Sequence, residues 1–537
     1  MSTPTNPTTF LINQRVHSLG NSTKIGTVKY VGNVEGYSGT WVGVDWDDIE
    51  SGKHDGVQNG VRYFQAKGEK SGSFVRLHSL SSGISLLEAL EVRYKGSSTK
   101  EEEDEMYVLS ANNKRVSIQL LGKDKAQDKM SRFEQLTNAA LSYLGVSSSG
   151  PSDGIRATIP KLKELDLTGN LLSDWKDISI ICQELPELAA INLSNNLMSH
   201  DISGMVELNN IRILVLNHTC ITWKQVEVLK DYLPDIEELH LMGNNLTEIT
   251  PTSSSTVQGF DSLRFLNLED NNISSWDEIV KLSQLKCLTK LFLNKNSLDS
   301  IWYPHDKALP EPGNSQDLLE KRCVPFENLS CLLLGGNEIE DLSSTEALNS
   351  FPNLIETRLS ENPLSDPGRG GVPRYVLIAC LAKVKILNSS EISARERKDS
   401  EIRYVRLAMS KVHDHPKENK WLHPRFEELK LRHGIEDERM SSKVSGPQKM
   451  ASGLISISLK CVGASMGEKP TLTKKLPAST TVGKLKNLCE SFFKIKSAKP
   501  KLFLQEEGSP FPTSLDDDMA SLIDVGVNNE STILVDE

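Results

Sequence analysis

Apolar residues recur through the middle of the chain in a fixed phrase, L-x-x-L-x-L-x-x-N-x-L, between Leu162 and Leu364. The clearest copy is Leu162, Leu165, Leu167, Asn170 and Leu172. Seven more copies have their asparagine position at Asn196, Thr219, Asn244, Asn271, Asn296, Asn337 and Asn362. These positions are 23 to 27 residues apart, except for one interval of 41 that contains an insertion. Such constant spacing predicts a repeat architecture rather than an ordinary helical protein rich in leucine.

Each copy predicts one short strand with inward leucines, followed by a turn whose asparagine amide satisfies backbone groups of the neighbouring coil. Because no copy can bury its apolar side alone, the copies should stack into a leucine-rich-repeat solenoid. A degenerate opening repeat is expected at Leu136, Ala139, Leu141, Leu144 and Val146, after a strand through Val116, Ile118 and Leu120. Residues 374–406 are expected to close the far end. The solenoid with both caps should span residues 116–410.

One outward-facing row of the repeats supplies candidate binding residues. The position between the second and third leucines points onto the concave sheet, and flanking positions join it. The candidates are Ile213, Val215, His240, Phe265, Lys290, Phe292, Leu333 and Arg358. An apolar centre edged by charge suits a protein-binding surface. Alternatively, some of these residues belong to a core beneath the proline-rich insertion at about 300–317.

Residues 10–80 carry glycines and aromatics at turn spacing, which predicts a small β domain. The run Gly52-Lys53-His54-Asp55-Gly56, near Trp41 and Phe74, resembles the CAP-Gly family. That family has a Gly-Lys-Asn-Asp-Gly loop beside an aromatic groove, which takes acidic, aromatic C-terminal tails such as that of α-tubulin. The resemblance implies the tail-binding candidates Tyr37, Trp41, Lys53, His54, Asp55 and Phe74.

This chain departs from the CAP-Gly pattern at two positions. His54 stands where the family usually has asparagine, and Gly36 stands where it usually has an aromatic residue, with Tyr37 one place later. Lys53 is expected to bind a terminal carboxylate, between apolar walls formed by Trp41 and Phe74. For Trp41 and Trp46, core packing is an equal alternative to a groove role.

Residues 81–115 and 411–451 are expected to be linkers. The first contains the acidic run Glu101 to Glu105, for which a solvated loop is favoured over a docking tail. The second is charged and is expected to be helical before it becomes flexible.

Residues 452–537 alternate again, with Ile455, Ile457 and Leu459 facing one side of a strand. A helix is expected with Val482, Leu485, Leu488, Cys489 and Phe492 on one side, followed by strands at 501–505 and 531–535. This order resembles a ubiquitin-like β-grasp domain. Because the chain ends in Val535-Asp536-Glu537 without a Gly-Gly pair, a docking role is expected rather than conjugation.

Composition narrows the functional classes. The net charge of −11 argues against general nucleic-acid binding. No apolar run approaches a membrane span, and residues 1–10 lack the basic and apolar regions of a secretory signal, so a cytoplasmic location is expected. The eight cysteines are scattered without a metal-binding or disulfide pattern, as expected of reduced core thiols.

The sequence shows no nucleophile with a base, no phosphate loop and no metal cluster. His413 and His415 are expected to lie in an exposed polar loop rather than a metal site. The chain is therefore expected to be neither an enzyme nor dependent on a cofactor.

The order of a CAP-Gly head, a capped leucine-rich solenoid and a ubiquitin-like tail resembles the tubulin-folding cofactor E family over nearly the whole chain. The resemblance implies a multidomain α/β chaperone associated with the cytoskeleton. It would bind α-tubulin and act with tubulin cofactors D, C and B to assemble or disassemble the α/β-tubulin heterodimer. The proteasome is a candidate partner of the tail. The alternative is a microtubule-associated scaffold that links tubulin to proteasome or ubiquitin machinery.

Overall fold

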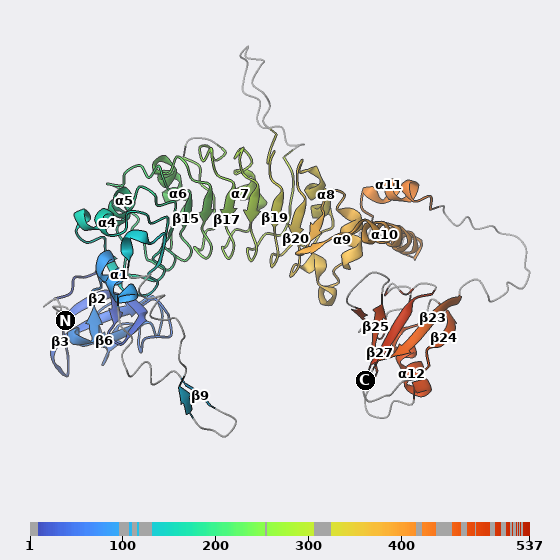
Figure 1. Ribbon diagram of the computed structural model, residues 1–537, viewed down its shortest axis with the longest axis horizontal. Coiled ribbons are helices and arrows are strands. Elements are labelled where there is room, and N and C mark those ends of the chain that lie inside the picture. Colours follow the sequence, from blue (N-terminus) through green and yellow to red (C-terminus); the bar gives the residue numbers. More distant parts are fainter. Residues whose placement is uncertain are drawn as a thin grey trace, which may run out of the picture. The chain divides into compact units, whose positions relative to one another are not determined.

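The computed structural model describes residues 9–95, 107–109, 115–117, 132–252, 255–304, 324–414, 422–435, 454–462, 470–477, 480–493, 500–505, 512–515 and 530–536, with the single residues 518, 522, 525 and 527. The chain divides into two compact units, Met1–Glu436 and Asp437–Glu537, whose elements are labelled in Figure 1. The expected multidomain fold, with a small β head, a repeat solenoid and a β-grasp tail, is confirmed.

The head is an antiparallel five-stranded sheet in the order β6-β3-β2-β1-β7. Its elements are β1 (Arg15–Ser18), β2 (Asn21–Val34), β3 (Tyr37–Trp46), the hairpin β4 (Val57–Gln58) and β5 (Val61–Arg62), β6 (Gly72–Val75), η1 (Leu77–Ser79) and β7 (Leu80–Ser81). Alternation along β3 places Val42, Val44 and Trp46 in the core on one face of the sheet. Trp46 is therefore a core residue, and only Trp41 lies on the opposite face.

The segment that was expected to be a linker, 81–115, begins with elements of the solenoid core. The strand β8 (Ile84–Ser85) pairs in parallel with β12 (Val146–Ser148), and α1 (Leu86–Tyr94) follows it. Ser85 and Glu88 form a reciprocal capping box that starts α1, a signal readable in the sequence. Beyond α1, β9 (Tyr107–Leu109) and β10 (Arg115–Ser117) form a hairpin, while Ile118 and Leu120 of the expected strand lie outside the described residues.

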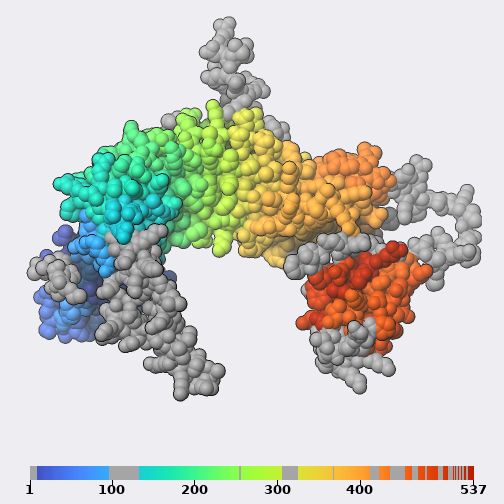
Figure 2. Space-filling model, viewed as in Figure 1, coloured from blue at the N-terminus to red at the C-terminus, as the bar shows by residue number. Residues whose placement is uncertain are grey.

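The solenoid is a single eleven-stranded sheet whose strands follow chain order from β11 to β22, leaving out the separately paired β12. Its strands are β11 (Asn138–Ala140), β13 (Glu164–Asp166), β14 (Ala190–Asn192), β15 (Ile213–Val215), β16 (Glu238–His240), β17 (Phe265–Asn267), β18 (Lys290–Phe292), β19 (Cys331–Leu333), β20 (Glu356–Arg358), β21 (Ile386–Leu387) and β22 (Ser390–Glu391). The middle residue of each repeat strand is buried and in register with its neighbours, as at Leu239, Leu266 and Leu291. In Figure 2 the repeats form consecutive bands from cyan to orange.

Buried asparagines join successive repeats, as the phrase predicts. Asn271 Nδ2 donates to the carbonyl oxygens of Leu241 and Leu268, both at 3.0 Å. Its Oδ1 accepts the backbone N–H groups of Asn244 and Leu246, both at 3.0 Å. One side chain thus satisfies four backbone groups that the turns would otherwise leave without partners.

Helices cover the side of the repeats away from the strands. They are α4 (Ser152–Thr158), α5 (Trp175–Glu184), α6 (Trp223–Leu229) with η3 (Lys230–Tyr232), α7 (Trp276–Val280) and α8 (Ser343–Ser350), and η2 (Phe133–Gln135) precedes the first repeat. Trp175, Trp223 and Trp276 each begin a helix and are buried. The tryptophans are therefore a second repeated core feature, beside the leucines.

The closing cap extends beyond the expected end of the solenoid at residue 410. It comprises η4 (Pro363–Ser365), η5 (Pro367–Arg369), α9 (Arg374–Cys380), α10 (Ala394–Asp414) and α11 (Arg425–Arg432). Val376 of α9, Tyr404 of α10 and Leu429 of α11 share one apolar core. The expected linker at 411–451 therefore begins inside α10 and contains the packed helix α11.

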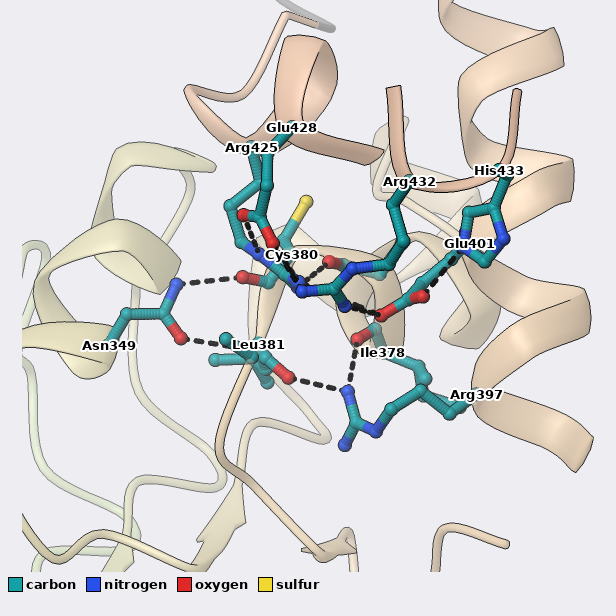
Figure 3. Close-up of polar contacts among 12 residues, drawn as sticks. Asn349, Ile378, Cys380, Leu381, Arg397, Glu401, Arg425, Glu428, Arg432 and His433 are labelled. Carbon is teal, nitrogen blue, oxygen red and sulfur yellow. Dashed lines mark hydrogen bonds and ion pairs between the residues drawn. The ribbon is translucent and has the colours of Figure 1, made fainter. Parts of the chain in front are cut away.

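Buried charges hold these cap helices together (Figure 3). Glu401 of α10 is 3% exposed and faces Arg425 at 3.6 Å, Arg432 at 3.5 Å and His433 Nε2 at 2.8 Å. Arg397 donates to the carbonyl oxygen of Ile378, in the last turn of α9, at 3.1 Å and to that of Leu381, just beyond α9, at 2.8 Å. These charged side chains need such partners because a buried charge without a partner would destabilise the folded cap.

The tail unit has the strand order β24-β23-β27-β25-β26, with β23 and β27 parallel. Its elements are β23 (Leu454–Cys461), β24 (Leu472–Pro477), α12 (Val482–Phe493), β25 (Lys501–Gln505), β26 (Thr513–Ser514) and β27 (Thr532–Asp536). The helix buries Val482, Leu485 and Cys489 as expected. Its last core residue is Phe493, whereas Phe492 is 47% exposed, because a period of 3.6 residues brings position 493 over 489.

Candidate protein-binding surfaces

An aromatic face lies on the side of the head sheet opposite the valine core. Strand register places Tyr30, Trp41 and Phe74 together on this face. Gly43 lies among them, and a Cβ atom there would come within 2.5 Å of the Phe64 ring. Glycine is needed at this position because the ring packs directly on the backbone of β3.

Phe74 lies at the centre of this aromatic face. Its ring centroid is 5.0 Å from that of His54 and 5.3 Å from that of Tyr63. The side chain is half-buried, so neighbouring rings fix its position while part of it stays open to solvent. This placement is compatible with the expected role of Phe74 as a groove wall.

Tyr37 and Trp41 form the adjoining part of the same face. Their ring centroids are 5.8 Å apart, and Tyr37 is 50% exposed. The guanidinium carbon of Arg76 lies 3.8 Å from the Trp41 ring centroid, and Arg76 Nη1 donates to Ser38 O at 2.8 Å. The sequence reasoning missed Arg76, although strand alternation could have revealed it. Gly36 occupies the β2–β3 turn at φ +84°, which explains glycine in place of an aromatic residue.

The loop at 52–56 is tied to β6 through its backbone. The N–H groups of Lys53 and His54 donate to Gly72 O at 2.7 and 3.1 Å, and Gly72 N–H donates to His54 O at 2.7 Å. A Cβ atom at Gly52 would lie 2.4 Å from Lys70 O, so only glycine fits there. The Lys53 side chain is exposed beside this anchored loop and can reach a docked carboxylate.

His54 and Asp55 have different surroundings. His54 Nδ1 accepts the Gly56 N–H at 3.0 Å, which requires an unprotonated nitrogen, and burial lowers the pKa of His54. The imidazole is therefore neutral at pH 7 and presents Nε2–H as its donor. Asp55 binds Arg62 at 2.7 Å, and this hydrogen bond lowers the pKa of its carboxyl group. The Asp55 carboxylate thus faces an arginine of its own chain.

The lowered pKa of His54 predicts a pH effect on the stability of the head. Stability is full above the unfolded pKa of about 6.5 and falls at lower pH, because the unfolded chain takes up the proton first. Asparagine at position 54 can accept the Gly56 N–H but cannot titrate. We expect His54→Asn to lose less stability than the parent between pH 7.5 and 5.5 in thermal unfolding. Equal losses of stability in the two proteins would show that His54 does not contribute to the pH dependence.

The solenoid strands present two outward columns of side chains, one on each side of the buried middle residue. All eight expected binding residues lie in these columns on one face: Ile213, Val215, His240, Phe265, Lys290, Phe292, Leu333 and Arg358. Lys290 is exposed and the other seven are half-buried. This surface is called the concave face below.

Three aromatic rings form the centre of the concave face. The ring centroids of His240 and Phe265 are 4.8 Å apart, and those of Phe265 and Phe292 are 4.6 Å apart. Burial lowers the pKa of His240 despite Glu238 at 3.6 Å. His240, Phe265 and Phe292 are called the aromatic run below, and at neutral pH it is uncharged.

The described part of the insertion packs on the helix side of the repeats. Trp276 Nε1 donates to Trp302 O at 2.6 Å, and the Tyr303 ring lies 5.0 Å from that of Phe351. Ile301 is also buried in the solenoid core. These contacts leave the aromatic run uncovered by residues 301–304, and the rest of the insertion lies outside the described residues.

Sequence reasoning also missed a hollow at the start of the concave face. It has a volume of about 320 Å³ and is lined by Tyr94 of α1 and by residues of β11 and β13 to β15. Ala190, Ile213 and Val215 provide its apolar surface, and Glu164 and Asp166 its charge. The hollow could have been found in the sequence from Ala190, a short residue that lies beside two acidic residues in the outward columns.

Within the described ranges, no group of three or more His, Cys, Asp or Glu side chains is placed to hold a metal ion. The same residues include no helix with the length and apolar character needed to cross a membrane. Cys331, beside the aromatic run, is buried with a pKa raised to about 12, mainly by burial and further by Glu356. Its thiol is therefore protonated and poorly nucleophilic at neutral pH.

Comparison with known proteins gives matches to the head, the tail and the whole chain. Residues 12–80 match the CAP-Gly domain family. The chain is 63% identical to tubulin-folding cofactor E of Arabidopsis thaliana, across 98% of both chains. It is 30% identical to tubulin-specific chaperone E of Danio rerio, across 95% of this chain and 96% of that one. A solution structure of the C-terminal ubiquitin-like domain of mouse tubulin-specific chaperone E matches with 27% identity and a TM-score of 0.15, covering 17% of this chain and 93% of that domain.

Proposed function

The chain belongs to the tubulin-folding cofactor E family, and on that premise we propose that it is a tubulin chaperone that binds α-tubulin. The observation that carries the proposal is the uncharged aromatic run on the concave face, joined in one chain to a head that matches the CAP-Gly domain family. Aromatic side chains gathered in the centre of an outward surface are typical of protein-binding hot spots.

The two surfaces suit different parts of one partner. The head groove offers Lys53, His54 and Trp41 to an acidic C-terminal tail, and the concave face offers Phe265 and Phe292 to a folded body. Two weak contacts carried by one chain strengthen each other, since the second forms at a high effective concentration. With the head bound to the tail and the concave face bound to the folded body, the chain would hold tubulin that is folded but not yet polymerised.

The proposed reaction is non-covalent. The chain would act with tubulin cofactors D, C and B to join α-tubulin to β-tubulin or to separate them, without a cofactor or catalytic group of its own. Its proposed place is the cytoplasm, in association with the cytoskeleton.

A pull-down with purified α/β-tubulin tests the proposal. A chaperone should form a soluble complex enriched in α-tubulin and should reduce the amount of polymer in co-sedimentation. The alternative, a microtubule-associated scaffold, should instead pellet with polymer and leave its amount unchanged.

We expect Lys53→Ala to weaken capture of tubulin about three- to tenfold, because a charge-assisted hydrogen bond to the tail would be lost. The measurement is a binding titration with tubulin that carries or lacks its terminal tyrosine. Lys70→Ala is the matched control, since Lys70 is also exposed in the head but pairs with Glu50 at 3.3 Å. If Lys53→Ala and Lys70→Ala bind alike, the groove does not hold the tail through Lys53.

The tail unit offers a third proposed contact. Phe503 of β25 and Leu534 of β27 are register partners on the face opposite the tail core, and both are half-buried. We propose this face as a docking site for the proteasome. Binding of purified proteasome by the chain, lost in Phe503→Glu, would support the assignment, and equal binding by both would refute it.

A further inference from the structure

The hollow at the start of the concave face has a mixed chemical character. Ala190 lies beside Glu164 in register across β13 and β14, and Ile213 follows on β15. Because Ala190 is short, the volume of about 320 Å³ opens between larger neighbours. The hollow therefore joins an apolar surface directly to a carboxylate.

The two carboxylates of the hollow have neutral partners. Glu164 accepts a hydrogen bond from the Asn138 side chain. Asp166 accepts from Ser142 Oγ at 2.7 Å and from Thr168 N–H at 2.9 Å. In the part of the chain that the structure describes, neither carboxylate forms an ion pair with lysine or arginine. Two negative charges thus lie on one face of β13, on residues whose Cα atoms are about 6.6 Å apart along the strand, without a positive partner among the described residues.

The remainder of the concave face differs from this end. Lys290 and Arg358 lie in its later strands, where Arg358 pairs with Glu361 at 2.6 Å. Glu238 of β16 and Glu356 of β20 also lie in the outward columns, but they share their strands with His240 and Arg358, whereas β13 presents two carboxylates. An acidic or nucleic-acid ligand would be repelled there, and a purely apolar one would leave both carboxylates desolvated without compensation.

We propose that the hollow receives one lysine or arginine side chain from the folded body of the captured tubulin. The aliphatic stem would lie on Ala190 and Ile213, and the cation would lie between Glu164 and Asp166, as long basic side chains often bury the stem while the head stays polar. This inference rests on the proposed function. It adds a basic anchor at one end of the concave face to the apolar contact at the aromatic run.

Two variants of the full chain test the hollow in independent ways. Glu164→Gln with Asp166→Asn removes both charges but keeps the shapes, and asparagine can still accept the Thr168 N–H. Ala190→Leu keeps the charges and fills the space. Glu187→Gln with Glu207→Gln is the control, because both of these acidic side chains are exposed and precede strands rather than lining the hollow.

Binding of purified α/β-tubulin is measured at several salt concentrations, with thermal unfolding as the check on folding. Each hollow variant should bind about tenfold more weakly than the parent. The charge variant should also show a weaker dependence on salt, and the control should match the parent. Parent-like affinity in both hollow variants overturns this inference and leaves the proposed function in place, whereas a parent chain that captures no tubulin overturns both.

Tubulin with acetylated lysines identifies the source of the cation. If the occupant is lysine, the difference between the parent and the charge variant should disappear with acetylated tubulin. If the occupant is arginine, that difference should persist.

Discussion

Glutamate at both Phe265 and Phe292 is expected to weaken capture of tubulin by about a hundredfold or more. The two rings are in contact at 4.6 Å between centroids and form the centre of the uncharged aromatic run. Truncating central aromatic residues of an interface costs about 2–4 kcal/mol, and buried charges without partners would add to that cost. The measurement is a binding titration of the full chain with purified α/β-tubulin.

The matched control for this variant places the same two charges elsewhere in the same repeats. Asn272→Glu with Ser297→Glu changes two exposed positions that lie in the turns after β17 and β18, away from the strand face. The control should bind tubulin as the parent does. If the double phenylalanine variant keeps its fold and also binds normally, the body of tubulin is held by another surface.

Replacement of Asn271 by alanine is expected to destabilise the solenoid by about 3–5 kcal/mol. The side chain is 4% exposed and satisfies the N–H groups of Asn244 and Leu246 together with the carbonyl oxygens of Leu241 and Leu268. Removing one buried partner leaves each of these groups unsatisfied, at about 1–3 kcal/mol per group before relaxation. Chemical unfolding of the chain should show a lower midpoint.

The next residue in the chain provides the control for Asn271→Ala. Asn272 is exposed, and its amide makes one long contact, to Asn245 Oδ1 at 3.4 Å. Asn272→Ala should change stability by no more than about 0.5 kcal/mol. Similar midpoints for the two variants would mean that the ladder asparagine does not stabilise the stack as its hydrogen bonds indicate.

The repeat strands could be predicted in detail because their signal is local and recurs. Each copy carries the same inward leucines, so the register Leu239–Leu266–Leu291 follows from alignment of the copies alone. The same alignment predicted that Phe265 and Phe292 point to the outward face of the sheet, since side chains alternate across a strand. Thr219 could also be placed in the ladder, where its hydroxyl lies 2.9 Å from Leu216 O.

The boundaries of the solenoid were harder to place because end caps do not repeat. The start of helix α1 could be predicted from the capping box of Ser85 and Glu88. Its place in the core, however, depends on contacts with repeats far along the chain. The helix α11 is highly charged, and the residues that hold it, such as Arg425, are buried only because Glu401 of α10 faces them. Composition alone therefore indicated a linker where the structure has a packed helix.

The sequence by itself determined the order of the three domains, the repeated strands and the row of side chains that the solenoid presents outward, because each depends on local periodicity. Only the tertiary structure decided the protonation of His54, the contact of Arg76 with Trp41 and the hollow beside Ala190. These features arise where residues from separate strands and loops meet. Their charge and shape depend on neighbours that no local pattern specifies.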